Sequence, residues 1–127
     1  MNIALDIDDT ITKIPPFFCL LARSIRHAGG KVYVLTSRSD EEFVRKHTQE
    51  ELASYGLEYD GLFIIPNSGS RGQLPCPHTD LDWYQKYLWQ KVKLCLDRDV
   101  HIVFDDDAKV VGLFKRFAPG IQVFHVL

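Results

Sequence analysis

The sequence predicts an α/β protein with a three-layer, Rossmann-like fold and a five-stranded parallel sheet in the order 5-4-1-2-3. Short apolar runs alternate along the chain with longer amphipathic segments, which is typical of strands joined by helical crossovers. Such crossovers are right-handed and place consecutive strands in one parallel sheet. The 127 residues suffice for one domain with its own hydrophobic core. We therefore expect a single domain over residues 1–127, with a loop insertion at about 66–79.

The first half of the chain predicts three strands and two helices. The apolar run at residues 3–5 is too short for a helix and ends in turn-forming residues, which indicates a buried strand. Pro15 suits the first turn of the next helix, and Gly29 lies just past its end. Ser39 has the character of an N-cap, and the acidic residues behind it complement a helix dipole. The expected elements are strand 2–6, helix 15–28, strand 31–36, helix 40–55 and strand 61–65.

The second half continues the alternation after one interruption. Residues 66–79 are rich in Gly, Pro and Ser, and a loop of this length inside a compact domain is usually functional or mobile. Thr79 or Asp80 is expected to cap the next helix, and Asp107 the last one. The expected elements are loop 66–79, helix 80–96, strand 101–104, helix 108–117 and strand 121–126.

Composition excludes several classes of protein. The net charge is −2 and the basic residues are scattered, so no duplex nucleic-acid binding is expected. No apolar stretch reaches membrane length, and no basic region precedes the first apolar run, so we expect a cytoplasmic protein without a membrane partner. Cys19, Cys76 and Cys95 form no CxxC pair, which predicts free thiols rather than disulfides or a zinc site.

Three of the expected strands end in polar, reactive residues. The carboxyl ends of parallel strands share one edge of the sheet, and ligands bind beyond that edge. We therefore expect these three clusters to lie together. They are Asp6-Ile7-Asp8-Asp9-Thr10, Thr36-Ser37-Arg38 and Asp105-Asp106-Asp107.

These residue types suit phosphoryl transfer assisted by a metal ion. Close carboxylates repel one another unless protons or a cation intervene, and carboxylate oxygens are ligands that Mg²⁺ prefers. One carboxylate can attack phosphorus, and a second, two positions on, can act as general acid and base. A hydroxyl and a lysine ammonium can bind the transferring oxygens.

The same residues resemble the motifs of the haloacid dehalogenase superfamily of phosphatases, and the resemblance spans most of the chain in the correct order. A short D-x-D-x-T motif is moderately specific by itself, whereas the full set at strand ends is strong. The matching residues are Asp6-x-Asp8-x-Thr10 for the first motif, Thr36 for the second and Asp105-Asp106 for the fourth.

The third motif of this superfamily is a lysine ahead of the fourth. Lys91 lies at the spacing that the family commonly shows, with Lys86 and Lys93 as rivals. The chain between Thr10 and Thr36 has room for one helix and no cap domain. The resemblance is therefore to a small, uncapped member.

The resemblance implies a Mg²⁺-dependent phosphomonoester hydrolase that works through an aspartyl-phosphate intermediate. Asp6 would be the nucleophile and Asp8 the general acid and base. Thr36 and Lys91 would bind phosphoryl oxygens. Thr10 would brace the turn at the edge of the substrate site.

The implied Mg²⁺ would take Asp6, the main-chain carbonyl of Asp8, and Asp106. Asp105 would either support these ligands or share the metal. Ser37 and Arg38 after the second motif resemble small nucleotidase-like members and would contact the substrate.

An uncapped site implies either a large phosphorylated substrate or a homo-oligomer that supplies a lid. Phosphorylated small molecules (nucleotides or sugar phosphates) and phosphorylated macromolecules, including polynucleotide ends, all remain open as partners. The loop at 66–79 could also close over a small substrate.

Other functions compete with this one. A receiver domain is disfavoured because its acceptor aspartate ends the third strand, where this chain has Ile64-Ile65-Pro66. A catalytically silent metal or phosphate-binding module and a phosphotransferase of the same superfamily remain as alternatives. A dehalogenase usually lacks the second acid, so Asp8 favours phosphate.

One further pattern is the aromatic stripe of the 80–96 helix. Core packing is the expected role of these side chains, and a dimer patch is the alternative. The stripe consists of Trp83, Tyr84, Tyr87 and Trp89.

Overall fold

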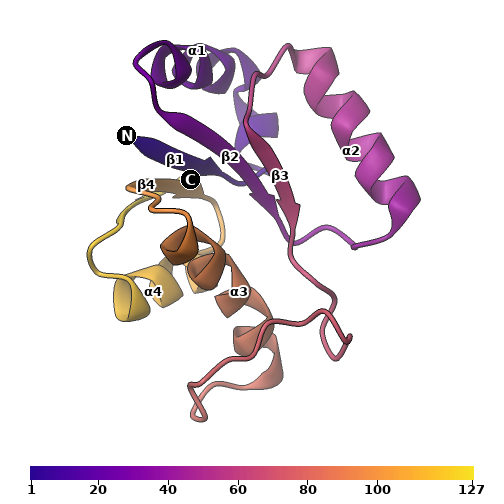
Figure 1. Cartoon of the computed structure of the whole chain (residues 1–127), viewed down its shortest axis with the longest axis vertical. Coiled ribbons are helices and arrows are strands. Elements are labelled where there is room, and N and C mark those ends of the chain that lie inside the picture. Colours follow the sequence, from indigo (N-terminus) through magenta and orange to yellow (C-terminus); the bar gives the residue numbers. More distant parts are fainter.

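The computed structural model describes residues 1–127 and confirms the expected fold class (Figure 1). All strand pairs are parallel, and the sheet order is β3-β2-β1-β4-β5, which is the expected order read from the other edge. The strands are β1 (Asn2–Leu5), β2 (Lys31–Thr36), β3 (Gly61–Ile64), β4 (Ile102–Asp105) and β5 (Gln122–His125). The helices are η1 (Ile11–Lys13, a 3-10 helix), α1 (Pro15–His27), α2 (Glu42–Tyr55), α3 (Trp83–Asp97) and α4 (Ala108–Phe117).

The helices form two layers, one on each face of the sheet (Figure 1). Side chains of α1 and α2, including Phe18 and Leu52, pack on one face against Ile3, Leu5 and Val34. Side chains of α3 and α4 pack on the other face in a second apolar cluster. The central strand β1 is therefore buried on both faces, which explains its continuous apolar run.

Two helices begin later than the sequence predicted. The expected N-cap at Ser39 was wrong: α2 follows Glu41, whose backbone is extended. The expected cap of α3 at Thr79 or Asp80 was also wrong. Asp82 caps this helix, because its side chain accepts a hydrogen bond from the Gln85 backbone while the Gln85 side chain accepts one from the Asp82 backbone.

The cap of α4 agrees with the sequence. The side chain of Asp107 accepts a hydrogen bond from the backbone of Lys109 at 2.8 Å. All three cysteines are free thiols, as expected. None of the helices combines the length and apolar character needed to cross a membrane.

The long connection between β3 and α3 contains no helix or strand, as expected for residues 66–79. The side chain of Gln90 on α3 fixes it at two points. Its amide oxygen accepts from the Leu74 backbone at 2.9 Å, and its amide nitrogen donates to the Pro66 carbonyl at 3.0 Å. Gln90 is fully buried, so these bonds satisfy a side chain that would otherwise be costly inside the protein.

Candidate active site

The turn after β1 separates its first two carboxylates by one buried residue. Ile7 inserts into the apolar core, while Asp6 and Asp8 both line a pocket at the carboxyl edge of the sheet. Asp9 has a φ of 59°, a left-handed conformation that aspartate tolerates better than most residues. Its backbone N–H donates to the Thr12 hydroxyl at 2.9 Å. The sequence of alternating apolar and acidic residues thus sets the direction of each carboxylate.

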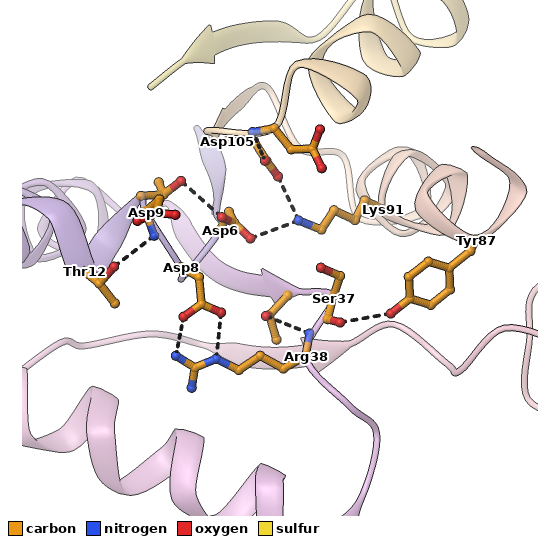
Figure 2. Close-up of polar contacts among 12 residues, drawn as sticks. Asp6, Asp8, Asp9, Thr12, Ser37, Arg38, Tyr87, Lys91 and Asp105 are labelled. Carbon is orange, nitrogen blue, oxygen red and sulfur yellow. Dashed lines mark hydrogen bonds and ion pairs between the residues drawn. The ribbon is translucent and has the colours of Figure 1, made fainter. Parts of the chain in front are cut away.

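Lys91 bridges the ends of β1 and β4 (Figure 2). Its Nζ lies 2.9 Å from Oδ1 of Asp6 and 2.8 Å from Oδ2 of Asp105. All three side chains are buried, and the lysine is 2% exposed. The second oxygen of Asp6 accepts a hydrogen bond from Thr10, and the second oxygen of Asp105 accepts one from the Asp107 backbone. This network holds both carboxylates in fixed orientations.

Burial and charge act in opposite directions in this network. Burial raises the pKa of Asp6 to about 6, although the neighbouring Lys91 acts to lower it. Burial likewise raises the pKa of Asp105 above its ordinary value, again against the lysine charge. For Lys91 burial acts to lower the pKa, but the two carboxylates outweigh it and raise the pKa. One ammonium therefore does not fully compensate the buried acids.

Asp8 forms a two-pronged ion pair with Arg38, which follows β2 (Figure 2). The arginine Nε donates to one carboxylate oxygen at 2.9 Å and Nη2 donates to the other at 2.8 Å. These hydrogen bonds lower the pKa of Asp8 below its ordinary value. The guanidinium is anchored on its far side by Thr48 and Glu51 of α2, each 3.0 Å from Nη1. The α2 layer thereby sets the orientation and the charge of Asp8.

The pocket at this edge has a volume of about 220 Å³. Six of its lining residues are aspartates, and Lys91 is the one cation among them. An anionic group such as phosphate would meet net repulsion here unless a cation entered first. The lining residues are Asp6, Asp8, Asp9, Ser37, Lys91, Asp105, Asp106 and Asp107.

Three of these aspartates form a candidate cation site. Asp6, Asp105 and Asp106 each offer one carboxylate oxygen, and these oxygens lie within 4.8 Å of one another. The donor set is oxygen alone, which suits Mg²⁺ better than zinc or copper. Both oxygens of Asp6 and both oxygens of Asp105 already accept hydrogen bonds within the protein, whereas Asp106 is only partly buried. The residues present therefore fit a hard divalent cation.

The predicted residues lie at one edge of the sheet, but only some of them line the pocket. Ser37 lines the pocket, while Thr10 and Thr36 are buried beneath it. The Thr36 hydroxyl accepts a hydrogen bond from the Arg38 backbone at 3.2 Å. Thr10 contacts Asp6, and Arg38 contacts Asp8, so both reach the pocket through an aspartate.

Of the three candidate lysines, only Lys91 reaches the pocket. Lys93 forms an exposed pair with Asp97 at 2.9 Å, one turn along the same helix. Lys86 does not line the pocket.

Sequence reasoning did not identify the residues that hold the site together from the helices. Glu51 and Thr48 orient Arg38, and the Tyr87 hydroxyl donates to the Ser37 carbonyl at 2.9 Å (Figure 2). Tyr87 lies four residues before Lys91, a spacing that places both on one face of α3. That spacing is the signal from which the tyrosine could have been found.

A larger hollow of about 550 Å³ lies at the opposite edge of the sheet. Arg23 and Arg26 line it, and both form ion pairs with Glu58, while Arg26 also pairs with Asp60. Its two arginines are thus paired within the protein, and the hollow holds none of the residues of the acidic pocket.

The chain is similar in fold to proteins from an RNA repair assembly. A chain in a structure of the Pnkp1/Rnl/Hen1 RNA repair complex superposes over 98% of this chain with a TM-score of 0.67 and 20% sequence identity. A second structure of the Pnkp1/Rnl/Hen1 complex gives 0.64 and 20% over 98% of this chain. The chain spans 42% and 45% of the length of these neighbours. No protein-family profile and no curated protein matches the chain.

Proposed function

We propose that this protein is a Mg²⁺-dependent phosphomonoesterase of the haloacid dehalogenase type. The observation that carries the proposal is the buried Asp6–Lys91–Asp105 bridge at the carboxyl edge of the sheet, inside a pocket rich in carboxylates. Buried carboxylates are costly unless they are paired or bind a cation, and they are concentrated here where α/β folds bind ligands.

Asp6 is the proposed nucleophile. Its carboxylate oxygen would form a bond to phosphorus while the bond between phosphorus and the ester oxygen breaks. Lys91 and Thr10 fix the carboxylate for this attack, since each contacts a different oxygen of Asp6. The pKa of about 6 requires a pH above that value for the anionic, reactive form.

Asp8 is the proposed acid and base. As an acid it would give its proton to the departing ester oxygen. As a base it would then take a proton from water, whose oxygen attacks phosphorus, releases inorganic phosphate and restores Asp6. The ion pair with Arg38 favours the charged form of Asp8, which suits the base step. The acid step requires Asp8 to take up a proton first, because only the protonated carboxyl can donate to the ester oxygen.

Asp6, Asp105 and Asp106 would hold Mg²⁺, which when bound neutralises the charge of a phosphoryl group. The ion would also offset the excess of aspartates in the pocket, which otherwise repels the substrate. Ser37 faces the same pocket and can donate its hydroxyl to a phosphoryl oxygen.

The fold neighbours are chains in a multi-protein RNA repair complex, and this supports two finer proposals for this chain. A phosphorylated polynucleotide end is the first macromolecular substrate to test, and protein partners are the first assembly to test. Nucleotides and sugar phosphates form the small-molecule panel.

The decisive experiment measures p-nitrophenyl phosphate hydrolysis with Mg²⁺ and with EDTA. Wild type is compared with Asp6→Asn, and Asp99→Asn serves as the matched control. Asp99 is exposed, precedes β4 at the far edge of the sheet, and has a φ of 51° that asparagine also tolerates. Mg²⁺-dependent hydrolysis that is lost only in Asp6→Asn supports the proposal. Hydrolysis that survives in Asp6→Asn refutes Asp6 as the nucleophile.

Binding of Mg²⁺ and phosphate without turnover in wild type would favour a catalytically silent binding module. Transfer of the phosphoryl group to an alcohol in place of water would favour a phosphotransferase.

A further inference from the structure

Three of the four residues in the aromatic stripe of α3 pack in or against the core as expected from the sequence, and Trp83 does not. Trp89 is buried in the apolar cluster, and Tyr84 and Tyr87 are half-buried against it. Trp83 is 69% exposed and so contributes little to the core. An exposed tryptophan beside two partly exposed tyrosines needs an explanation other than stability.

These three aromatic rings form a continuous series that starts at the acidic pocket. The hydroxyl of Tyr87 donates to the carbonyl of Ser37, a residue that lines the pocket (Figure 2). The ring centroids of Tyr87 and Tyr84 are 6.2 Å apart, and those of Tyr84 and Trp83 are 5.5 Å apart. We call Trp83, Tyr84 and Tyr87 the aromatic ladder.

The ladder shares its helix face with the pocket lysine. Tyr84, Tyr87 and Lys91 are spaced by three and four residues, so they lie one above another on α3. Four residues of helix rise about 6 Å, which places the Cα atom of Tyr87 one turn from that of Lys91, whose ammonium contacts Asp6. A ligand with its phosphate beside Lys91 can therefore extend directly along these rings.

A cation accompanies the ladder. The Nζ of Lys109, in the first turn of α4, lies 5.0 Å from the centroid of the Tyr84 ring. One cation therefore lies beside the middle ring of the ladder, whereas the pocket itself is acidic. Aromatic faces with a nearby cation are the features that bind single-stranded nucleic acid through its bases and its phosphates.

We propose that the aromatic ladder binds nucleobases, so that the substrate is a nucleotide or single-stranded polynucleotide whose terminal phosphate enters the acidic pocket. This inference rests on the proposed phosphatase function and names its substrate class. Stacking on the rings tolerates any base, because every base has a flat π face. The ladder would select for the presence of a base rather than for a sequence.

The first test measures binding without turnover. Asp6→Asn protein with Mg²⁺ is titrated with a short oligothymidylate that carries a phosphate at either the 3′ or the 5′ end, with thymidine monophosphate, and with deoxyribose phosphate, which lacks a base. Trp83 and Trp89 are the two tryptophans of the chain, and Trp89 is 5% exposed, so fluorescence quenching reports on Trp83. We expect quenching by the ligands that carry a base and none by deoxyribose phosphate.

The second test compares variants in the same background. Binding is measured here by isothermal titration calorimetry, because Trp83→Ala lacks the tryptophan that reports by fluorescence. Trp83→Ala should weaken oligothymidylate binding roughly 5- to 150-fold, the range for loss of one stacked base. It should leave deoxyribose phosphate binding unchanged. Phe43→Ala is the matched control, because Phe43 is 72% exposed on α2 and outside the ladder. Thermal unfolding of each variant checks that it is folded.

The outcomes separate the inference from the proposed function. Equal binding of ligands with and without a base, or an equal effect of Trp83→Ala and Phe43→Ala, overturns the ladder even if p-nitrophenyl phosphate is hydrolysed. Base-dependent binding without any hydrolysis would support base binding by the ladder and would refute the proposed phosphatase function. A Trp83 effect confined to the oligothymidylate identifies a polynucleotide end, and one shared with thymidine monophosphate identifies a nucleotide.

Discussion

Replacement of Lys91 by methionine tests the electrostatic design of the site. Methionine keeps most of the side-chain length but removes the ammonium, which lies 2.9 Å from Asp6 and 2.8 Å from Asp105. At an effective dielectric constant of 20, each lost attraction is about 6 kcal/mol. Two effects offset much of this lost attraction: the variant no longer has to desolvate a lysine ammonium, and one of the buried carboxyls can take up a proton. Removal of one partner of a buried pair then has a net cost of about 3–5 kcal/mol.

The measurement is urea unfolding at pH 7 in EDTA, with Lys93→Met as the control. Lys93 forms an exposed pair with Asp97 on the same helix, and such pairs contribute about 0–1 kcal/mol. We expect Lys91→Met to lower the free energy of unfolding by about 3–5 kcal/mol and Lys93→Met by at most about 1 kcal/mol. Equal effects of the two substitutions would refute the view that the buried bridge is a structural necessity.

The stability loss of Lys91→Met should change with pH in one direction. Without the lysine, burial acts unopposed and raises the pKa values of Asp6 and Asp105 further above their unfolded values. The folded variant then holds protons that the unfolded chain releases. The loss of unfolding free energy relative to wild type, which we call the deficit, is therefore complete above the folded pKa values and shrinks as the pH falls toward 4. A deficit that grows on acidification would contradict the assignment. Mg²⁺ should also reduce the deficit at pH 7, because it replaces the missing positive charge.

Three further predictions concern other parts of the chain. Mg²⁺ affinity, measured by calorimetric titration, should fall about tenfold per pH unit below pH 6, because the cation must displace a proton from Asp6; equal affinity at pH 5 and pH 7.5 would contradict it. Arg38→Gln should raise the pKa of Asp8, measured by NMR titration of its side-chain carboxyl carbon, and an unchanged value would contradict the control of Asp8 by Arg38. Gly112→Ala, at an exposed interior position of α4 with no atom within 4 Å of the added carbon, should stabilise the protein by about 0.5–1 kcal/mol. Gly56→Ala, at a φ of +77°, should destabilise it by about 1–2 kcal/mol, and urea unfolding of both variants tests this contrast.

Local patterns were sufficient to predict the fold. The buried run of β1 and the alternation of strand and helix led to the correct parallel sheet, since a right-handed crossover leaves few arrangements for such a chain. The position of the site also followed, because parallel strands deliver their carboxyl ends to one edge. Helix starts were less reliable. Several residues before α3 can cap a helix, and only Asp82 has the reciprocal bond with Gln85.

The sequence alone determined which residues end the strands, and therefore which carboxylates meet at the edge of the sheet. Tertiary structure decided how their charges are balanced. The phase of α3 directs Lys91, and neither Lys86 nor Lys93, between Asp6 and Asp105. Contacts with the α2 layer turn Arg38 onto Asp8. The same packing leaves Trp83 in solvent while Trp89 is buried. The physical reason is that strand ends are fixed by local pattern, whereas the partner of a long side chain depends on which helix face packs against the sheet.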